Sequence, residues 1–579
     1  MNSYAIEPVV VTATRTEIRA DRVLASVDVV SGEELLRLPG ADLGDVLRMR
    51  AGVEVARLGG PGQQTSLFLR GTESNHVLVL VDGVRINPGS IGNAAIQNIA
   101  PELIERVEIV KGPRSTLYGS DALGGVINVI TRRSAASGAS VQAGAGSNDT
   151  RSASASAGVN GTRGDASFGV AWLDSDGFPT RSGDTTDRGY DNLSLTAAAR
   201  TTLAGVKLGL RAWHASGTSE YSDFFVTPVD QDFENSVVAL TAGLAPAGPW
   251  DSHFTLAHTL DEIEQNQATD FLRTRRWRLD WQNDIVVSEA QTLTAGVILQ
   301  EEDADAESFG LPYDATTRTT QAYFQDQASF GPHRLLFAAA YADHETFGGQ
   351  ATWNAEYGLE IGEHALLMLA VGTAFRAPDA TDLYGFGGNA DLNPEQSRSY
   401  ELGYRQGIGE RQSVSLTLFH NEIDDLIQFV ITDFGTFEGE NRNVEHARID
   451  GLEAAWHYGG ELWAARASLS LHDPRDRLTD GRLLRRAREN VSLGALRRIG
   501  AHEFAVDLLY AGDRKDFGFP APVTMSAYWL ANLSARVAIN ERWTMLARME
   551  NLLDQDYELA RGFNTMGRSL FVAIRHTFR

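Results

Sequence analysis

Two segments of this sequence carry an unusual density of aspartate. The first, LDSDGFPTRSGDTTDRGYDN, begins at Leu173, and the second, EYSDFFVTPVDQDFEN, begins at Glu220. Carboxylates crowded onto neighbouring loops repel one another unless a hard cation collects them, and Ca²⁺ takes six to eight oxygen ligands. The spacing does not fit an EF-hand, because DSDGF lacks the third acidic position and the terminal Glu. A calcium site is therefore one interpretation, and a solvated acidic face is the other.

A basic run forms a second candidate site. The segment GRLLRRAREN contains Arg482, Arg485, Arg486 and Arg488. A guanidinium fork is suited to a phosphodiester or a carboxylate, so this run could contact an anionic group of a ligand. The alternative is that these side chains face lipid headgroups.

Two loops without charge form a third candidate site. Residues 57–64 and 87–93 are rich in Gly, Gln, Asn and Ser and carry no charge after Arg57. Such a surface can donate hydrogen bonds to a neutral polar ligand and approach it closely. Ordinary turn chemistry is the alternative. The candidate contacts are Leu58, Gln63, Gln64, Ser66, Asn87, Ser90 and Asn93.

Composition and missing motifs exclude several classes of protein. The 579 residues include no Cys, which excludes disulfides, thiolate metal sites and cysteine catalysis. The formal charge of -25 opposes nucleic acid binding, which needs a basic footprint. Serine-hydrolase, zinc-protease and P-loop patterns are absent, so we expect no enzymatic activity. No run approaches eighteen apolar residues, so a membrane-spanning form would have to be a β-barrel.

The elements that must position these residues change in character after Arg133. Residues 15–133 contain the short, mixed segments of a small α/β domain, with a helix start at Ser31, a stop at Pro39 and a hairpin turn at Asp82-Gly83. From there on, polar and apolar residues alternate, as in VKLGLRAW and SVSLTLFH. At about twenty residues per strand with its connection, the remaining chain allows roughly 22 strands, and a barrel of that size needs a plug. An array of soluble β-sandwiches, the alternative, would show linkers and domain-length repeats.

The segment from Pro101 to Arg133 predicts two β-branched strands joined by a glycine-rich corner. A Gly pair before an apolar strand indicates backbone packed where a Cβ would clash. The run resembles the plug signature of TonB-dependent outer-membrane transporters; a β-hairpin of an unrelated α+β domain is the alternative. The signature positions are filled by Val107-Glu108-Ile109, Gly112-Pro113, Tyr118-Gly119, Gly124-Gly125-Val126-Ile127-Asn128 and Thr131.

The resemblance implies a mainly β protein of three parts. Residues 1–14 would hold the TonB box, residues 15–133 an α/β plug domain, and residues 134–579 a transmembrane β-barrel that encloses the plug, multi-pass in the bacterial outer membrane. The segment EPVVVTA is extended with no neighbour to pair with, and such a strand can add to a sheet edge of TonB, which acts with an inner-membrane energising complex. A disordered tail is the alternative. The residues assigned to the TonB box are Glu7, Pro8, Val9, Val10, Val11, Thr12 and Ala13.

Both ends of the chain are compatible with this assignment. The N-terminus, MNSYAIEPVV, has no basic n-region and no apolar h-region, so we expect a form from which a signal peptide has been removed. The C-terminal run GRSLFVAIRHTFR resembles the closing strand of outer-membrane barrels, with one face formed by Leu570, Val572, Ile574 and Phe578. The family normally ends on an aromatic residue, and Arg579 departs from that pattern by one position.

Within the family, three segments resemble the cobalamin receptors most: LRGTESNHVLVLVDGVRIN, FRAPDATDLYGFGGNADLNPEQSRSYELG and NEIDDLI. Receptors for ferric siderophores or haem are the alternative. The resemblance implies cobalamin as the transported ligand, contacted by Tyr221 and Arg485, and a monomer surrounded by outer-membrane lipid and lipopolysaccharide. It also implies calcium in the extracellular loops. The implied calcium ligands are Asp174, Asp184, Asp187, Asp191, Asp223 and Asp230.

Overall fold

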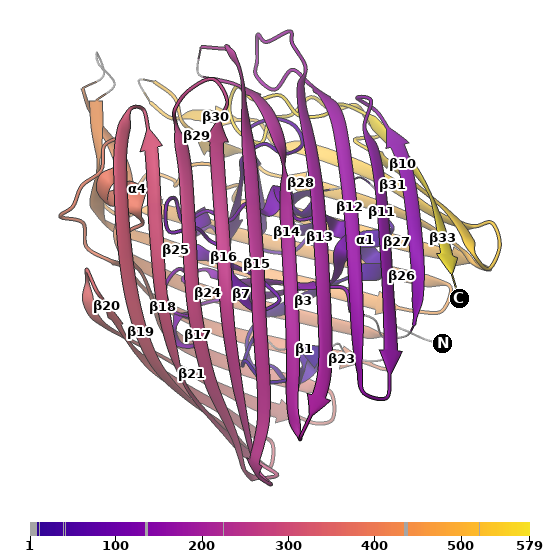
Figure 1. Cartoon of the computed structure of the whole chain (residues 1–579), viewed down its shortest axis with the longest axis vertical. Coiled ribbons are helices and arrows are strands. Elements are labelled where there is room, and N and C mark those ends of the chain that lie inside the picture. The colour runs from indigo at the N-terminus through magenta and orange to yellow at the C-terminus, as the bar shows by residue number, and fades with distance from the viewer. Residues whose placement is uncertain are drawn as a thin grey trace.

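The computed structural model describes residues 9–10, 12–38, 40, 42–133, 137–223, 225–433, 438–519 and 521–578. A closed barrel of 22 strands surrounds a smaller N-terminal domain, the plug, which lies in the lumen (Figure 1). This confirms the predicted fold.

The barrel strands follow one another in chain order, each antiparallel to its neighbours. The last strand pairs with the first, with Ala139 opposite Phe578 and Gly146 opposite Phe571, which closes the sheet. The strands are β10 (Gly138–Gly146), β11 (Arg151–Gly161), β12 (Gly164–Phe178), β13 (Arg188–Leu203), β14 (Val206–Ser222), β15 (Pro228–Ala247), β16 (Trp250–Gln265), β17 (Phe271–Ser288), β18 (Gln291–Ser308), β19 (Leu311–Phe330), β20 (His333–His344), β21 (Gly348–Ile361), β22 (Ala365–Arg376), β23 (Glu395–Ile408), β24 (Gln412–Asp433), β25 (Glu438–Gly459), β26 (Trp463–Asp476), β27 (Glu489–Ile499), β28 (His502–Ala511), β31 (Tyr528–Ala538), β32 (Trp543–Glu550) and β33 (Ser569–Phe578).

The two ends of the barrel differ. Tight turns such as 161–164 and 203–206 join strands at one end, which we call the turn end. Most connections at the other end are longer, and they carry α4 (Ala380–Tyr384) and the small ladder of β29 (Arg514–Asp516) with β30 (Val523–Met525). This loop end is at the top of Figure 1.

The plug is built on a sheet in the order β3-β8-β9-β6-β7, in which only β6 and β9 are parallel. Within the described part of the chain, no helix is long and apolar enough to cross a membrane. The plug elements are β1 (Val9–Val10), β2 (Ile18–Arg19), η1 (Ala20–Arg22), β3 (Val27–Ser31), α1 (Gly32–Leu36), α2 (Leu43–Leu47), β4 (Val53–Arg57), β5 (Thr65–Leu69), η2 (Ser74–His76), β6 (Val77–Val81), β7 (Val84–Arg85), η3 (Ile96–Asn98), η4 (Pro101–Leu103), β8 (Ile104–Lys111), α3 (Ser115–Tyr118) and β9 (Gly125–Thr131).

Local sequence signals account for several plug elements. The Ser31 hydroxyl accepts a hydrogen bond from the Glu34 N–H at 3.3 Å and starts α1, as predicted. Asp82 and Gly83, with φ of 52° and 85°, form the predicted turn between β6 and β7. Pro39, the predicted stop of the first helix, lies outside the described residues.

The glycine-rich corner of the plug is as close-packed as the sequence predicts. Gly125 begins β9 with a φ of 149°, and a Cβ there would clash with the carbonyl oxygen of Val110 and with Leu69. Only glycine fits this position, because it has neither a Cβ nor a penalty for positive φ. The corner therefore brings β9 against β8 in antiparallel register.

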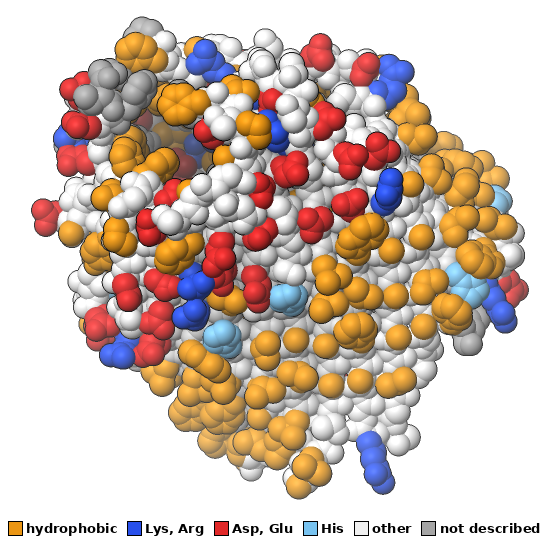
Figure 2. Space-filling model, turned by 45° about the horizontal axis from the view of Figure 1, so that its top comes forward, with side chains coloured by type: hydrophobic (Ala, Val, Ile, Leu, Met, Phe, Trp, Pro, Cys, Tyr) orange, Lys and Arg blue, Asp and Glu red, His pale blue; other side chains and the backbone are white. Residues whose placement is uncertain are grey.

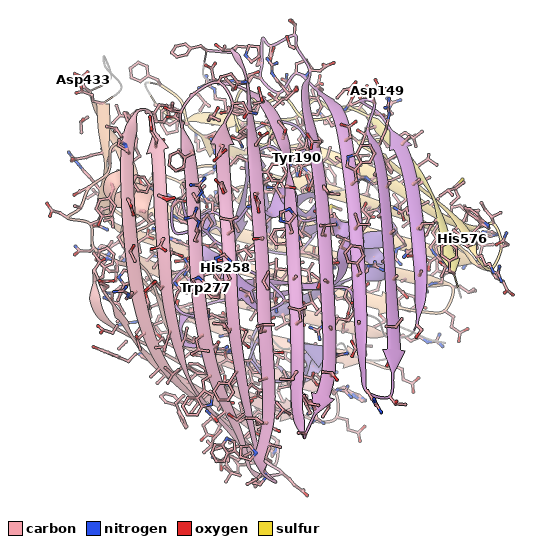
Figure 3. All side chains as sticks on the ribbon, viewed as in Figure 1. Asp149, Tyr190, His258, Trp277, Asp433 and His576 are labelled. Carbon is pink, nitrogen blue, oxygen red and sulfur yellow. The ribbon has the colours of Figure 1, made fainter. Side chains whose placement is uncertain are left out.

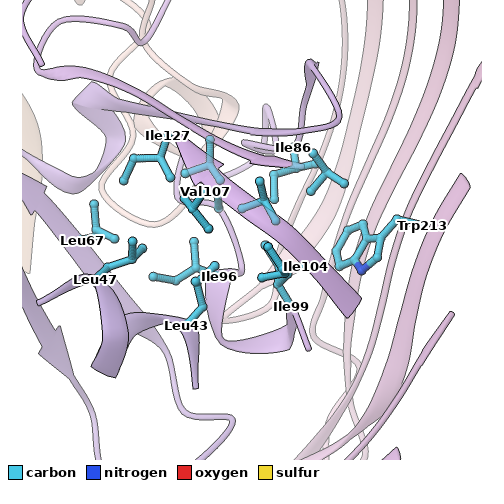
Figure 4. Packing of buried hydrophobic residues seen from close by; sticks show 14 of the residues in the cluster. Leu43, Leu47, Leu67, Ile86, Ile96, Ile99, Ile104, Val107, Ile127 and Trp213 are labelled. Carbon is cyan, nitrogen blue, oxygen red and sulfur yellow. The ribbon is translucent and has the colours of Figure 1, made fainter. Parts of the chain in front are cut away.

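One hydrophobic core joins the plug to the barrel wall. Leu47, Ile96, Ile104 and Ile127 are almost completely buried, and Trp213 of β14 packs against the same cluster (Figure 4). Burying each such side chain stabilises the structure by about 1.5–3 kcal/mol. The plug therefore fills the lumen by direct contact.

The outer face of the barrel is apolar, as the alternation predicts. Leu208, Leu416 and Leu418 are exposed on it, and His258 packs on Trp277 with ring centroids 4.7 Å apart (Figure 3). Acidic side chains gather toward the loop end (Figure 2). The C-terminal strand also has the predicted apolar face, because Leu570 and Ile574 of β33 are exposed on the outer face.

The N-terminal segment corrects one expectation. Val9 and Val10 were expected to have no neighbour, but they pair as β1 with Arg19 and Ile18 of β2. The chain folds back on itself after Thr12, which places a strand edge of its own within reach. The other TonB-box residues Glu7, Pro8 and Val11 lie outside the described residues.

Candidate functional site

The first neutral loop of the plug, at the tip of the β4–β5 hairpin, is tied to the barrel. The Gln63 amide donates to the carbonyl oxygen of Glu220 at 2.6 Å and lies 3.4 Å from the Ser219 hydroxyl, both on β14. Gln64 is exposed, and Leu58 and Ser66 are half-buried. Gln63 therefore holds the loop in place, whereas Gln64 stays exposed.

The second neutral loop follows β7 and is organised by Asn87. This buried side chain accepts from the Val79 N–H at 2.7 Å and donates to the carbonyl oxygens of Val77 at 3.0 Å and Gly92 at 2.8 Å. Three hydrogen bonds occupy its amide. Asn87 was predicted to contact ligand, but the structure gives it a role in holding the loop.

The tip of the second loop contacts the barrel through Ser90. The Ser90 N–H donates to the Thr274 hydroxyl at 3.1 Å, and its carbonyl oxygen accepts from the Thr381 N–H at 2.9 Å, at the start of α4. Asn93 is half-buried, and its amide oxygen has no hydrogen-bond partner among the described residues. Of the predicted amides in this loop, Asn93 is the one with capacity left.

A buried charge cluster joins η2 of the plug to the barrel, and the sequence analysis did not assign it. The Arg376 guanidinium lies 2.7 Å from Glu395, 2.7 Å from Asp379 and 2.6 Å from Asp382. Glu395 also lies 3.1 Å from the ring of His76 in the plug. The segment FRAPDATD contains three of these residues, and this local crowding of Arg with Asp was the available signal.

The basic run separates into residues with different roles. Arg485 donates to Asp516 at 2.9 Å and keeps about a third of its side chain exposed. Arg486 is buried, lies 4.3 Å over the ring of Phe68 and pairs with Glu73 of the plug at 2.7 Å. Arg486 therefore binds a barrel loop to the plug, whereas the predicted contact Arg485 stays partly exposed.

The predicted calcium ligands all lie at the loop end, but they are separately engaged. Asp184 accepts hydrogen bonds from Arg188 at 2.8 Å and from Ser222. Asp223 accepts from two N–H groups of its own loop, at 2.8 and 2.7 Å. Asp230 accepts from Asn266 at 2.5 Å and from the Gln267 amide.

The other three carboxylates do not complete a site. Asp174 stands opposite Asp191 in the β12–β13 ladder, Asp191 accepts from the Thr218 N–H at 3.3 Å, and Asp187 is exposed. Within the described ranges, no group of three or more His, Asp or Glu residues could hold a metal ion. In this arrangement the residues do not fit a calcium site, and calcium binding stays a prediction.

Aromatic side chains surround the entrance. The Tyr221 hydroxyl, at the end of β14, accepts from the amide of Gln265. Phe309, Phe386 and Phe429 form an exposed cluster, with ring centroids 5.4 Å and 6.0 Å apart along the series. We call these three residues the aromatic rim. They come from distant segments, so no pattern in the sequence pointed to the cluster.

Two family models match consecutive parts of the chain. The TonB-dependent receptor plug domain matches residues 19–126, and the TonB-dependent receptor-like β-barrel matches residues 135–552. Together they cover both the lumenal domain and most of the barrel strands described above.

Curated relatives match over nearly the full chain. A vitamin B12 transporter BtuB from Vibrio vulnificus is 32% identical over 99% of this chain and 95% of its own length. The protein of the same name from Photobacterium profundum is 29% identical over 98% of this chain and 95% of its own length.

Solved structures share the fold at lower identity. The siderophore receptor PirA from Acinetobacter baumannii superimposes with a TM-score of 0.82 at 18% identity, covering 95% of this chain and 98% of that one. The ferripyoverdine receptor of Pseudomonas aeruginosa gives 0.84 at 16% identity, covering 99% and 89%. With the plug and barrel matches, these findings show that the chain belongs to the TonB-dependent receptor family and is an outer-membrane β-barrel transporter.

Proposed function

We propose that this protein binds cobalamin at the loop end of the barrel and transports it across the outer membrane, with energy supplied through TonB. The observation that carries the proposal is the near full-length similarity to two proteins named vitamin B12 transporter, at 32% and 29% identity. The siderophore receptors share 18% and 16% identity, a level that supports the fold alone.

The geometry at the loop end supports a corrinoid. Such a ligand combines a flat macrocycle, amide side chains and one phosphodiester. The exposed amide of Gln64 and the unpaired amide oxygen of Asn93 match amide groups. The aromatic rim offers apolar ring faces, and Arg485 offers a guanidinium to a phosphate.

The proposal treats the protein as a monomer in contact with outer-membrane lipid and lipopolysaccharide. Closure of the barrel needs no second chain, because β33 pairs with β10 of the same chain. The apolar outer face suits acyl chains.

A binding measurement tests the ligand. Purified protein would be titrated with cyanocobalamin and, separately, with a ferric catecholate, each in the presence and absence of calcium. We expect tight binding of the corrinoid and hardly any of the catecholate. Submicromolar binding of the catecholate without corrinoid binding would overturn the proposal in favour of a siderophore receptor.

A further inference from the structure

One sector of the barrel wall presents mostly small side chains to the plug, with Gln142 and Leu173 as the larger ones. Outward-facing Val159, Phe168 and Trp172 are exposed on β11 and β12, and strand alternation turns their neighbours inward. The inward residues include Ser152, Ser154, Ser156 and Gly158 on β11, and Gly169 and Ala171 on β12. We call this sector, with β10, the small-residue wall; β10 to β12 stand at the right of Figure 1.

Two cavities lie between this wall and the plug, one above the other. The first has a volume of about 110 Å³ and is lined by Ser154 of β11 and Glu102 of the plug. The second is an open recess of about 910 Å³, lined by Ser156 and by Leu103. Ser154 and Ser156 are successive inward residues, and Glu102 and Leu103 are adjacent, so the cavities are neighbours along the same wall.

Two close contacts separate the cavities. Leu103 lies against Gly169, where an added Cβ would stand 2.8 Å from the leucine Cδ2. Phe571 of β33 lies against Gly144 of β10, where a Cβ would stand 2.6 Å from the ring. Glycine at both positions lets these side chains fill the gap. Displacing Leu103 and Phe571 would join the two spaces.

Guanidinium nitrogens without hydrogen-bond partners in the described part of the chain line both cavities, although Nη2 of Arg48 pairs with Asp45 at 3.0 Å. Arg48 is 8% exposed, and its Nε and Nη1 atoms have no hydrogen-bond partner among the described residues, although the side chain borders the first cavity. Nε and Nη2 of Arg132 are likewise unpartnered within that set and border the second. Buried donors are normally satisfied, so these guanidinium groups are suited to acceptors that enter the cavities, such as amide or phosphate oxygens.

Buried ion pairs hold the plug to other sectors of the barrel. Arg70 pairs with Glu453 of β25 at 3.1 Å, and Lys111 lies 3.1 Å from the same carboxylate. Arg114 pairs with Glu356 of β21 at 2.9 Å. The barrel partners in these pairs belong to β21 and β25 and not to β10, β11, β12 or β13. Breaking a buried pair leaves an uncompensated charge. The contact of β12 with the plug at the Ser167 hydroxyl is a hydrogen bond to the Arg132 carbonyl oxygen, at 3.3 Å, so separating plug and wall there does not break the ion pairs of Arg70, Lys111 or Arg114.

We propose that the transported ligand crosses the barrel between the plug and the small-residue wall, through the two cavities and past Leu103 and Phe571. This inference rests on the proposed function, because it takes a corrinoid as the ligand. A corrinoid is much larger than the first cavity, so the plug must draw away from the wall during transport. The ion pairs with β21 and β25 hold the opposite side of the plug while it does so.

The absence of cysteine from the chain allows a direct test. Ser156→Cys would be folded into the outer membrane and then modified with a bulky maleimide, with the modified fraction measured by mass spectrometry. Ser154→Trp fills the first cavity without modification. The matched controls are Ala155→Cys and Ala155→Trp, because Ala155 lies between the two serines and opposite exposed Val141, on the outer face.

Surface binding and accumulation of radiolabelled cyanocobalamin would be measured for every variant. Modified Ser156→Cys and Ser154→Trp should bind at wild-type affinity while accumulation falls by about tenfold or more, because a filled close-packed gap leaves no passage. The Ala155 controls should accumulate normally. Accumulation at the control rate in both blocked variants would overturn the route alone. If unmodified protein and controls bind no cobalamin, the proposed function is wrong, and the route is overturned with it.

Discussion

Thr12 donates both its backbone N–H and its hydroxyl to one carboxylate oxygen of Glu108, at 3.0 and 2.6 Å. Both side chains are completely buried. Tyr118 donates to the Thr12 carbonyl oxygen and Asn128 to its hydroxyl, each at 3.0 Å. The end of the segment assigned to the TonB box is therefore fastened to β8 and β9, and a partner must pull against these bonds.

Thr12→Val should loosen this attachment. Valine keeps the volume but removes the hydroxyl, so a buried carboxylate loses a charge-assisted hydrogen bond, at a cost of about 1–3 kcal/mol. A spin label on Val9→Cys should then become more mobile. Thr16→Val is the control, because the hydroxyl of Thr16 bonds to Gln327 and not to Glu108. Equal label mobility in both variants would show that Thr12 does not restrain the segment.

Val10→Pro should separate binding from transport. Val10 lies in the two-residue ladder opposite Ile18, and proline removes its N–H and fixes φ. We expect energised uptake to be abolished, because strand addition to TonB depends on backbone groups. Equilibrium binding of cobalamin to cells should stay near wild type, because the segment is far from the loop end.

Paired assays on the same cells check both halves of that expectation. Uptake at the wild-type rate would mean that the valine run is only a tail. Loss of surface binding would mean that the run is part of the plug's fold.

Replacing Asp223 and Asp230 together by Asn tests calcium. Calcium could order these loops only by drawing both carboxylates out of their present hydrogen bonds. Removing two charged ligands should lower calcium affinity by about tenfold or more, and cobalamin affinity with it. Asp165→Asn with Asp251→Asn, near the turn end, is the charge-matched control. If calcium dependence is the same in both double variants, the cluster is a solvated acidic face.

Glu34 should make the stability of the plug resistant to acid. Burial alone would raise the pKa of this carboxyl, but the charges of Arg466 and Arg50 outweigh burial and hold the pKa well below its usual 4.5. Because the folded-state pKa is depressed, the stabilisation is complete above pH 4.5 and is lost only as the pH falls through the lower folded value. Glu34→Gln should destabilise the plug by about 1–3 kcal/mol at neutral pH, because it removes one of the two carboxylates that pair with Arg466, the other being Asp507 at 2.8 Å.

Thermal unfolding of wild type and Glu34→Gln across a pH series would measure this contribution. The difference between the two proteins should stay constant from neutral pH to about pH 4.5 and narrow at lower pH. A difference that disappears between pH 7 and 5 would contradict the assignment of Glu34 as a depressed carboxyl.

The sequence by itself determined the architecture. Alternation along VKLGLRAW and SVSLTLFH identified strands with one apolar face, and chain length then gave the size of the barrel. The turn at Asp82-Gly83 and the requirement for Gly125 were also readable. These features depend on backbone conformation and short-range periodicity, which a linear pattern encodes directly.

Only the tertiary structure decided which candidate side chains remain available. Asn87 and Asn93 look alike in the sequence, yet one amide is consumed inside the plug and the other keeps an unpaired oxygen. Arg485 and Arg486 are adjacent, yet one keeps a third of its side chain exposed and the other is buried against Phe68. The small residues of β11 likewise point to a route for the ligand only because the fold places them near Leu103 of the plug. A side chain is unavailable to a ligand when residues distant in sequence bind it by hydrogen bonds or pack against it. The order of residues in the chain does not show these contacts, so it cannot show which side chains remain available.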